Sequence, residues 1–298
     1  MKSRLFIYVS LGADISIAVS KFIAAGITGS SSMISEAVHS VIDAVSQILL
    51  IWGIRMSKKR PDLERPFGYG KEFYFWSFVV SLIIFLLGGC ISLFEGYVKI
   101  RHPEFKGKPG WSYIVLAIAF VFTIISLAAA SKVFNRQRGD VSFFKAITQS
   151  KDPSTFIVLL GDIGDLAGII VAFLGIYFGR LYHNPYYDGI ASVIIGLILI
   201  VISMVLVRES KSLLMGETTS RKTLRRIVAI AQADEAVIKV KKHFSMYMAP
   251  EEVLLQLIAV FKDNLTTIEI TDSIERITKT IQKEFPRIRQ IFIEPAAK

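Results

Sequence analysis

Cysteine is almost absent from this chain of 298 residues, because Cys90 is its single example. One thiol excludes a disulfide framework and a zinc site built from cysteines. Histidine is also scarce, with four residues in the whole chain. The sequence offers neither a nucleophile and base paired for covalent catalysis nor a phosphate-binding loop, so we do not expect an enzyme.

Charged residues are missing from several long stretches, whereas hydrophobic residues make up 52% of the chain. Several apolar runs reach the roughly 20 residues that a helix needs to cross a bilayer. The first run begins like a signal peptide but has no convincing cleavage site, so we interpret it as a retained span. The six predicted spans are Leu5–Ile27, Ser31–Met56, Phe73–Ile100, Trp111–Phe134, Pro153–Phe178 and Asp188–Leu214. The segment Val141–Ile147 is predicted to be a short helix along the membrane surface.

The net charge of +10 does not indicate a nucleic-acid partner, because Lys and Arg gather in the loops beside the predicted spans. Loops rich in these residues mark the cytoplasmic side of a membrane protein. Their distribution predicts an integral membrane protein in contact with lipid, with both termini in the cytoplasm. The cell membrane is its favoured location.

The composition becomes more polar after Gly216. We therefore predict a six-span transmembrane transport domain over residues 1–215 and a cytosolic α+β domain over residues 216–298. The order helix, strand, strand, helix, strand in the second domain is typical of a sheet with helices on one face. These elements are predicted at Arg221–Ala233, Ala236–Met246, Val253–Phe261, Ile268–Phe285 and Ile288–Glu294.

Ionisable residues interrupt the second and fifth predicted spans. His39 and Asp43 are four residues apart, which places both on one face of a helix. Asp162 and Asp165 are three apart and are also neighbours on a helix face. Charged side chains at membrane depth are costly, so they should face a bundle interior or a water-filled cavity. We predict that the two helices face each other and hold a divalent cation with these four residues.

The ligand chemistry narrows the choice of cation. One imidazole nitrogen with carboxylate oxygens suits Zn²⁺, which is the favoured ion. The excess of carboxylate keeps Fe²⁺, Mn²⁺ and Co²⁺ open, since harder ligands suit harder ions. Two structural alternatives remain. His39 and Asp43 can form a hydrogen-bonded pair, and Asp162 can bond a neighbouring span.

Other charged residues lie inside the first two predicted spans, among them Asp14, Lys21 and Glu36. Asp14 and Lys21 are seven residues apart, two turns along one helix face, and we expect structural polar contacts from them to another span. Glu36 lies one turn before His39. It is expected to line a vestibule or to pair with Lys21.

Several short stretches taken together form a specific pattern. They are His39-Ser40-Val41-Ile42-Asp43, Arg65-Pro66-Phe67-Gly68-Tyr69-Gly70-Lys71-Glu72, Asp152-Pro153-Ser154-Thr155, Asp188-Gly189, Arg208-Glu209-Ser210 and Leu213-Leu214-Met215-Gly216-Glu217. With these stretches the chain resembles the cation diffusion facilitator family of divalent-metal transporters over nearly its whole length, and in particular a branch with zinc-transporter relatives. The resemblance implies six helices, a cytosolic ferredoxin-like domain, a homodimer and exchange of metal for protons.

The chain departs from the family pattern in the fifth span. The family usually has His or Asp four residues before the position of Asp165, where this chain has Gly161. The branch often has Glu-Asp where this chain has Gly161-Asp162. The resemblance therefore supports Asp165 through the general motif and Asp162 through the branch.

The sequence thus predicts a secondary transporter that moves a divalent metal out of the cytosol in exchange for protons. The metal is its substrate, and no cofactor is expected. Metal binding needs a neutral His39 and ionised carboxylates, so affinity should rise with pH. The alternative is a non-transporting membrane scaffold, or a metal-sensing protein, that acts through its cytosolic domain. Gly161 is the best support for this alternative.

Overall fold

The computed structural model describes residues 2–103, 110–138, 142–143, 146–147 and 150–297, with the backbone alone for residues 2–14, 133, 136–138 and 155. The chain divides into two compact units. The first comprises Met1–Arg55 and Phe75–Lys211, and the second comprises Met56–Tyr74 and Ser212–Lys298. The predicted division at Gly216 stays a prediction. The short helix predicted over 141–147 falls partly on residues outside these ranges.

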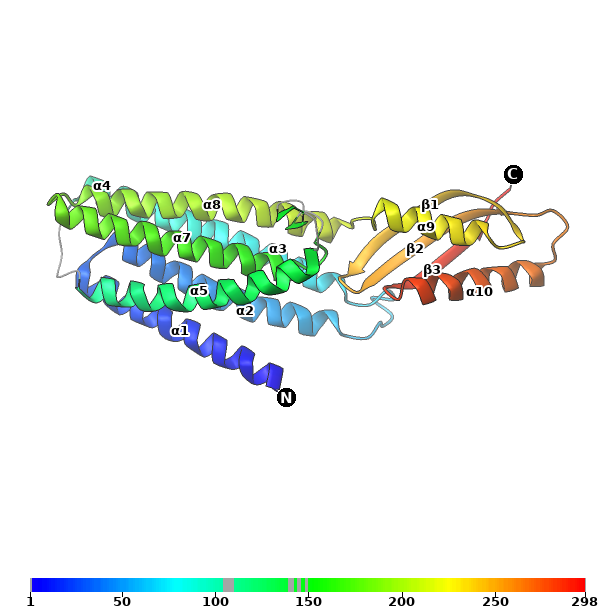
Figure 1. Cartoon of the computed structure of the whole chain (residues 1–298), viewed down its shortest axis with the longest axis horizontal. Helices are drawn as coiled ribbons and strands as arrows, with labels where there is room; N and C mark the ends of the chain where they lie inside the picture. Colours follow the sequence, from blue (N-terminus) through cyan, green and yellow to red (C-terminus); the bar gives the residue numbers. More distant parts are fainter. Residues whose placement is uncertain (1, 104–109, 139–141, 144–145, 148–149, 298) are drawn as a thin grey trace. The chain divides into compact units, whose positions relative to one another are not determined.

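Long helices build the first unit (Figure 1). They are α1 (Lys2–Thr28), α2 (Ser31–Ser57), α3 (Lys71–Ile83), η1 (Ile84–Cys90), α4 (Ile91–Arg101), α5 (Gly110–Arg138), α7 (Pro153–Leu181) and α8 (Tyr186–Met215). Five helical segments of the described residues are long and apolar enough to cross a membrane, namely Ser31–Ser57, Lys71–Arg101, Gly110–Lys132, Phe156–Leu181 and Tyr186–Met215. The apolar part of α1, Ile15–Thr28, adds the sixth helix. The predicted fold class, a six-helix bundle followed by a small α+β layer, is confirmed.

The third span contains a π-helical stretch, η1, between α3 and α4. A π-helical turn inside an α-helix shifts the face that the helix presents. Here it accompanies a close approach to α8, because a Cβ at Gly89 would lie 2.5 Å from Ile200 Cγ1. The outer surfaces of the bundle are apolar, as they are on α8, where Ile190, Leu197 and Val201 are exposed. Such surfaces suit contact with lipid.

A carboxylate from another helix fastens the beginning of α2. Asp188 in the first turn of α8 is buried and accepts hydrogen bonds from Ser30 Oγ (2.6 Å), the Ser31 N–H (2.8 Å) and Ser32 Oγ (2.5 Å). The first N–H groups of a helix lack partners within the helix, and a negative charge there is favourable. Asp188 thereby stabilises the N-terminal end of α2, about two turns before His39.

The second unit contains α9 (Arg221–Gln232), β1 (Val237–Ala249), β2 (Glu252–Phe261), α10 (Thr267–Glu284) and β3 (Ile288–Pro295). The sheet has the order β1-β2-β3, antiparallel between β1 and β2 and parallel between β2 and β3. The helix α9 packs against β1, and α10 packs against β3 and α9 (Figure 1). Alternate residues of β2 supply the core between sheet and helices, so that Leu255 and Leu257 are fully buried with Ile227 and Ile281.

An ion pair joins α10 to the turn after α9. Arg276 donates to both carboxylate oxygens of Asp234 at 3.0 and 3.1 Å, and Ser273 Oγ donates to Oδ1 at 2.8 Å. Partial burial raises the pKa of Asp234, but the hydrogen bonds from Arg276, Ser273 and the Ala236 N–H outweigh this effect and hold the pKa below its ordinary value. The charged form of this carboxylate therefore stabilises the fold.

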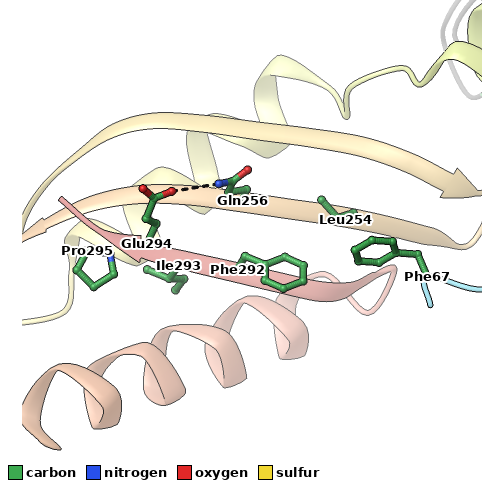
Figure 2. Close-up of a pocket in the computed structure, with 7 residues that line it drawn as sticks. All are labelled: Phe67, Leu254, Gln256, Phe292, Ile293, Glu294 and Pro295. Carbon is green, nitrogen blue, oxygen red and sulfur yellow. Dashed lines mark hydrogen bonds between the residues drawn. The ribbon is translucent and has the colours of Figure 1, made fainter. Parts of the chain in front are cut away.

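The loop 56–74 belongs to the second unit through contacts with its strands. A Cβ at Gly70 would lie 2.6 Å from the Met248 carbonyl oxygen, so the loop can approach β1 closely only with glycine there. Phe67 packs edge-on against Phe292 of β3, with ring centroids 6.4 Å apart. Both rings border an open pocket on the sheet, which is also lined by Glu294, and Glu294 accepts a hydrogen bond from Gln256 (Figure 2).

Candidate metal centre

Three of the four predicted ligands come together in the first unit. One ligand atom each from His39, Asp43 and Asp165 lies within 4.8 Å of the other two. His39 Nε2 is 3.5 Å from Asp43 Oδ2, as the spacing of four residues on α2 requires. His39 is buried, whereas the side chains of Asp43 and Asp165 keep 29% and 16% of their exposure. This is the only group of at least three such residues among those that the structure describes.

Glycine lets α7 pack closely against α8 beside the ligand group. A Cβ at Gly164 would lie 2.8 Å from Ile202 Cδ1, which is too close, and 3.8 Å from His39 Cε1, which is an ordinary contact. The missing side chain therefore matters for the approach to α8, and the next residue, Asp165, belongs to the ligand group.

Asp162 lies outside this group. Its Oδ2 accepts a hydrogen bond of 2.8 Å from Ser126 Oγ of α5. This contact corresponds to the alternative in which Asp162 bonds a neighbouring span. Its role as a ligand stays a prediction.

Asp165 is held from two sides by residues of other helices. Thr123 of α5 donates a short hydrogen bond to Oδ2. Lys21 of α1 donates to Oδ1, with its Nζ at 3.3 Å. The contact of Lys21 with another span was expected from the sequence, but Asp165 as its partner was not. The side chain of Asp14 lies outside those that the structure describes.

The ammonium of Lys21 makes its shorter contact with Glu36 of α2, at 2.9 Å. Both side chains are fully buried. The predicted pairing of these two residues is confirmed. Glu36 Oε1 lies over Gly168, where a Cβ would come within 2.1 Å of it, and this oxygen and His39 Nδ1 have no hydrogen-bond partner among the described residues. The buried carboxylate of Glu36 can stay charged only because Lys21 pairs with its other oxygen, Oε2.

The net negative charge of this cluster matches the charge of a divalent cation. Lys21 and Glu36 cancel each other, and His39 is neutral when it acts as a ligand. Asp43 and Asp165 then contribute two negative charges. Ligand atoms about 2.1 Å from one tetrahedral ion lie about 3.4 Å apart, so side-chain shifts of about 1 Å would gather the three groups around one ion.

The helices, their apolar surfaces and this cluster of ionisable residues together define an integral membrane protein. A model of the cation efflux transmembrane domain matches residues 7–215. The chain therefore belongs to the cation diffusion facilitator family.

Several curated proteins are similar to this chain in sequence. The proton-coupled zinc antiporter SLC30A9, mitochondrial, of Mus musculus is 32% identical over 219 residues, which are 73% of this chain and 39% of that protein. Its counterpart in Homo sapiens matches with the same identity and coverage. The chain thus spans about two fifths of the length of these relatives. The manganese efflux system protein MneP of Bacillus subtilis is 24% identical over 304 residues, which are 98% of this chain and 95% of that protein.

Proposed function

We propose that this protein moves a divalent transition-metal cation out of the cytosol in exchange for protons. The observation that carries the proposal is the grouping of His39, Asp43 and Asp165 on two apolar helices. A buried imidazole and two partly buried carboxylates at membrane depth are costly unless they bind something. A divalent cation supplies the charge that the cluster lacks.

The exchange with protons follows from the same ligands. An imidazole and a carboxylate bind metal only in their deprotonated forms, so metal binding releases protons and protonation releases metal. Helices that rock around a fixed site would expose it to one side of the membrane at a time. A pH difference across the membrane can then drive the metal in one direction.

Zn²⁺ is the proposed substrate. The ligand set of one imidazole and two carboxylates supports it, and so does the similarity to proteins named as proton-coupled zinc antiporters. The similarity to a protein named as a manganese efflux system makes Mn²⁺ the second candidate substrate. We also propose that the protein forms a homodimer and that both of its termini lie in the cytoplasm.

The test is transport by the purified protein in sealed vesicles, with a pH-sensitive dye inside and Zn²⁺, Mn²⁺, Fe²⁺ or Co²⁺ outside. We expect Zn²⁺ entry to be coupled to proton exit. His39→Ala, Asp43→Ala and Asp165→Asn should each abolish both signals. Asp162→Asn should lose them as well if Asp162 is a ligand, and should keep them if it only bonds Ser126. Full transport by the first three variants would refute the proposed site.

A second candidate is a metal-sensing scaffold that binds the ion without moving it. Gly161 favours it, because this position lacks the side chain that the family usually supplies, and a Cβ there would meet no atom within 4 Å. The same vesicles separate the two functions. A sensor would release protons on adding Zn²⁺ in detergent but would carry no metal across the vesicle membrane.

A further inference from the structure

Lys21 presents a positive charge to the same carboxylate that the proposed metal needs. Its Nζ is 3.3 Å from Asp165 Oδ1, while Thr123 holds the other oxygen of that carboxylate. An ammonium and a divalent cation that share one carboxylate oxygen repel each other, and the repulsion is strong where water is excluded. The two cations therefore compete for Asp165.

Glu36 determines which partner Lys21 keeps. The contact of Lys21 with Glu36 is shorter, at 2.9 Å against 3.3 Å, and Glu36 is fully buried. Leaving Glu36 without Lys21 would leave a fully buried negative charge without its ion-pair partner. Asp165 keeps 16% of its exposure and has Thr123 as a second donor, so it can exchange Lys21 for a metal at lower cost.

We propose that Lys21 is a tethered competitor for the metal at Asp165 and thereby sets the affinity of the site. Glu36 retains the ammonium when the metal takes Asp165. When the metal leaves, Lys21 returns to Asp165 and compensates the carboxylate. The metal is thus bound less tightly and is released more readily than the three ligands alone would allow. This inference rests on the proposed function.

Two variants of the ion pair between Lys21 and Glu36 should shift the affinity for Zn²⁺ in opposite directions. Glu36→Gln removes the charge that restrains Lys21, so the ammonium binds Asp165 more strongly and the Kd for Zn²⁺ should rise roughly tenfold. Removing both charges, with Lys21→Met and Glu36→Gln together, takes the competitor away without leaving a buried charge. The Kd should then fall roughly tenfold below the parent value, and turnover in vesicles should slow because release is slower.

The experiment is calorimetric titration of Zn²⁺ into the purified full chain in detergent, at one pH and ionic strength, followed by transport in vesicles. Lys132→Met makes the same substitution at an exposed lysine of α5 and should leave both quantities unchanged. Opposite shifts for Glu36→Gln and the double variant would support the role of Lys21, because a merely structural pair would weaken binding in both variants.

Two outcomes would overturn the inference, and they can be told apart. If the parent transports Zn²⁺ but the double variant binds it as weakly as the parent or more weakly, Lys21 is not a competitor while the proposed function stands. If the parent neither binds nor transports any of the four ions, the proposed function fails and the inference fails with it.

Discussion

The carboxylate of Asp188 should contribute much of the stability of the first unit without affecting the metal site. It accepts hydrogen bonds from the hydroxyls of Ser30 and Ser32 through Oδ1 and from the Ser31 N–H through Oδ2. All four residues are buried. The hydroxyls can turn, and they already lie 3.0 Å from each other, whereas the N–H of Ser31 has a fixed direction.

These contacts allow the cost of two substitutions to be estimated. In Asp188→Asn the amide oxygen can accept from the Ser31 N–H and the amide nitrogen can donate to the hydroxyls, so the contacts survive without the charge. A hydrogen bond to a charged group is worth about 1 kcal/mol more than a neutral one, so three of them lose about 3 kcal/mol. Asp188→Ala removes every acceptor and leaves the N–H unpaired, which should cost about 5 kcal/mol.

Thermal unfolding in detergent measures this effect. A loss of 1 kcal/mol in the free energy of unfolding lowers the Tm of a chain of this size by about 2 °C or more. Asp188→Asn should therefore lower the Tm by about 6 °C, and Asp188→Ala should lower it by about 10 °C. His39 lies eight residues, or about 12 Å, further along α2 than Ser31, so the Kd for Zn²⁺ should stay near the parent value. Asp272→Asn, at an exposed carboxylate on α10, is the control.

If both Asp188 variants melt within about 1 °C of the parent, the carboxylate does not hold the start of α2, and the charged hydrogen bonds have been overvalued. If they melt as expected but bind Zn²⁺ much more weakly, the start of α2 is coupled to the metal site. The argument from distance along the helix would then be wrong.

Three further predictions concern single positions. Gly168→Ala should destabilise the protein by about 1–3 kcal/mol in thermal unfolding, because its Cβ would collide with Glu36, whereas Gly161→Ala should leave the helix packing intact. Asp234→Asn should lower stability by about 1–3 kcal/mol near neutral pH. Since the folded pKa of Asp234 is depressed, its contribution is present above the unfolded pKa of about 3.9 and should vanish as the pH falls through the lower folded value. Ile281→Ala should cost about 2–5 kcal/mol through a cavity in the second unit, measured by denaturant unfolding.

The secondary structure of the second unit could be predicted closely because residue content indicates its strands and helical spacing indicates α10. The predicted helix Ile268–Phe285 is observed at Thr267–Glu284, and the predicted strand Ile288–Glu294 at Ile288–Pro295. Strand-like residue content over Val253–Phe261 identifies β2, and helical spacing of isoleucines identifies α10. The strand β1 extends beyond its predicted end at Met246 to Ala249, because pairing with β2 continues to the turn.

The interior of the third span could not be predicted from hydropathy. A predominantly apolar run predicts one helix over Phe73–Ile100, and hydropathy does not reveal the π-helical stretch η1 inside it. Its glycines indicate close packing only after the partner helix is known. Gly89 lies against Ile200, which is more than one hundred residues away in the sequence.

Only some of the residues that come together in the metal cluster could be predicted from the sequence. Spacing alone puts His39 beside Asp43, because both are on one helix. The choice between Asp162 and Asp165 depends on the rotation of α7 against α2 and α5, and residues three apart on a helix fit either rotation. In the structure Asp165 faces the histidine, and Asp162 receives a hydrogen bond from Ser126.

Only one of the two acidic partners of Lys21 could be predicted from the sequence. A lysine at membrane depth requires an acidic partner, and Glu36 is near enough along the chain to be proposed for that role. Pairing with Glu36 alone would make Lys21 a structural residue. The additional contact with Asp165 arises because α1 and α7 both lie against α5, which no spacing in the sequence encodes. That contact joins a structural ion pair to a candidate metal ligand, so the affinity of the site depends on a residue that does not bind the metal.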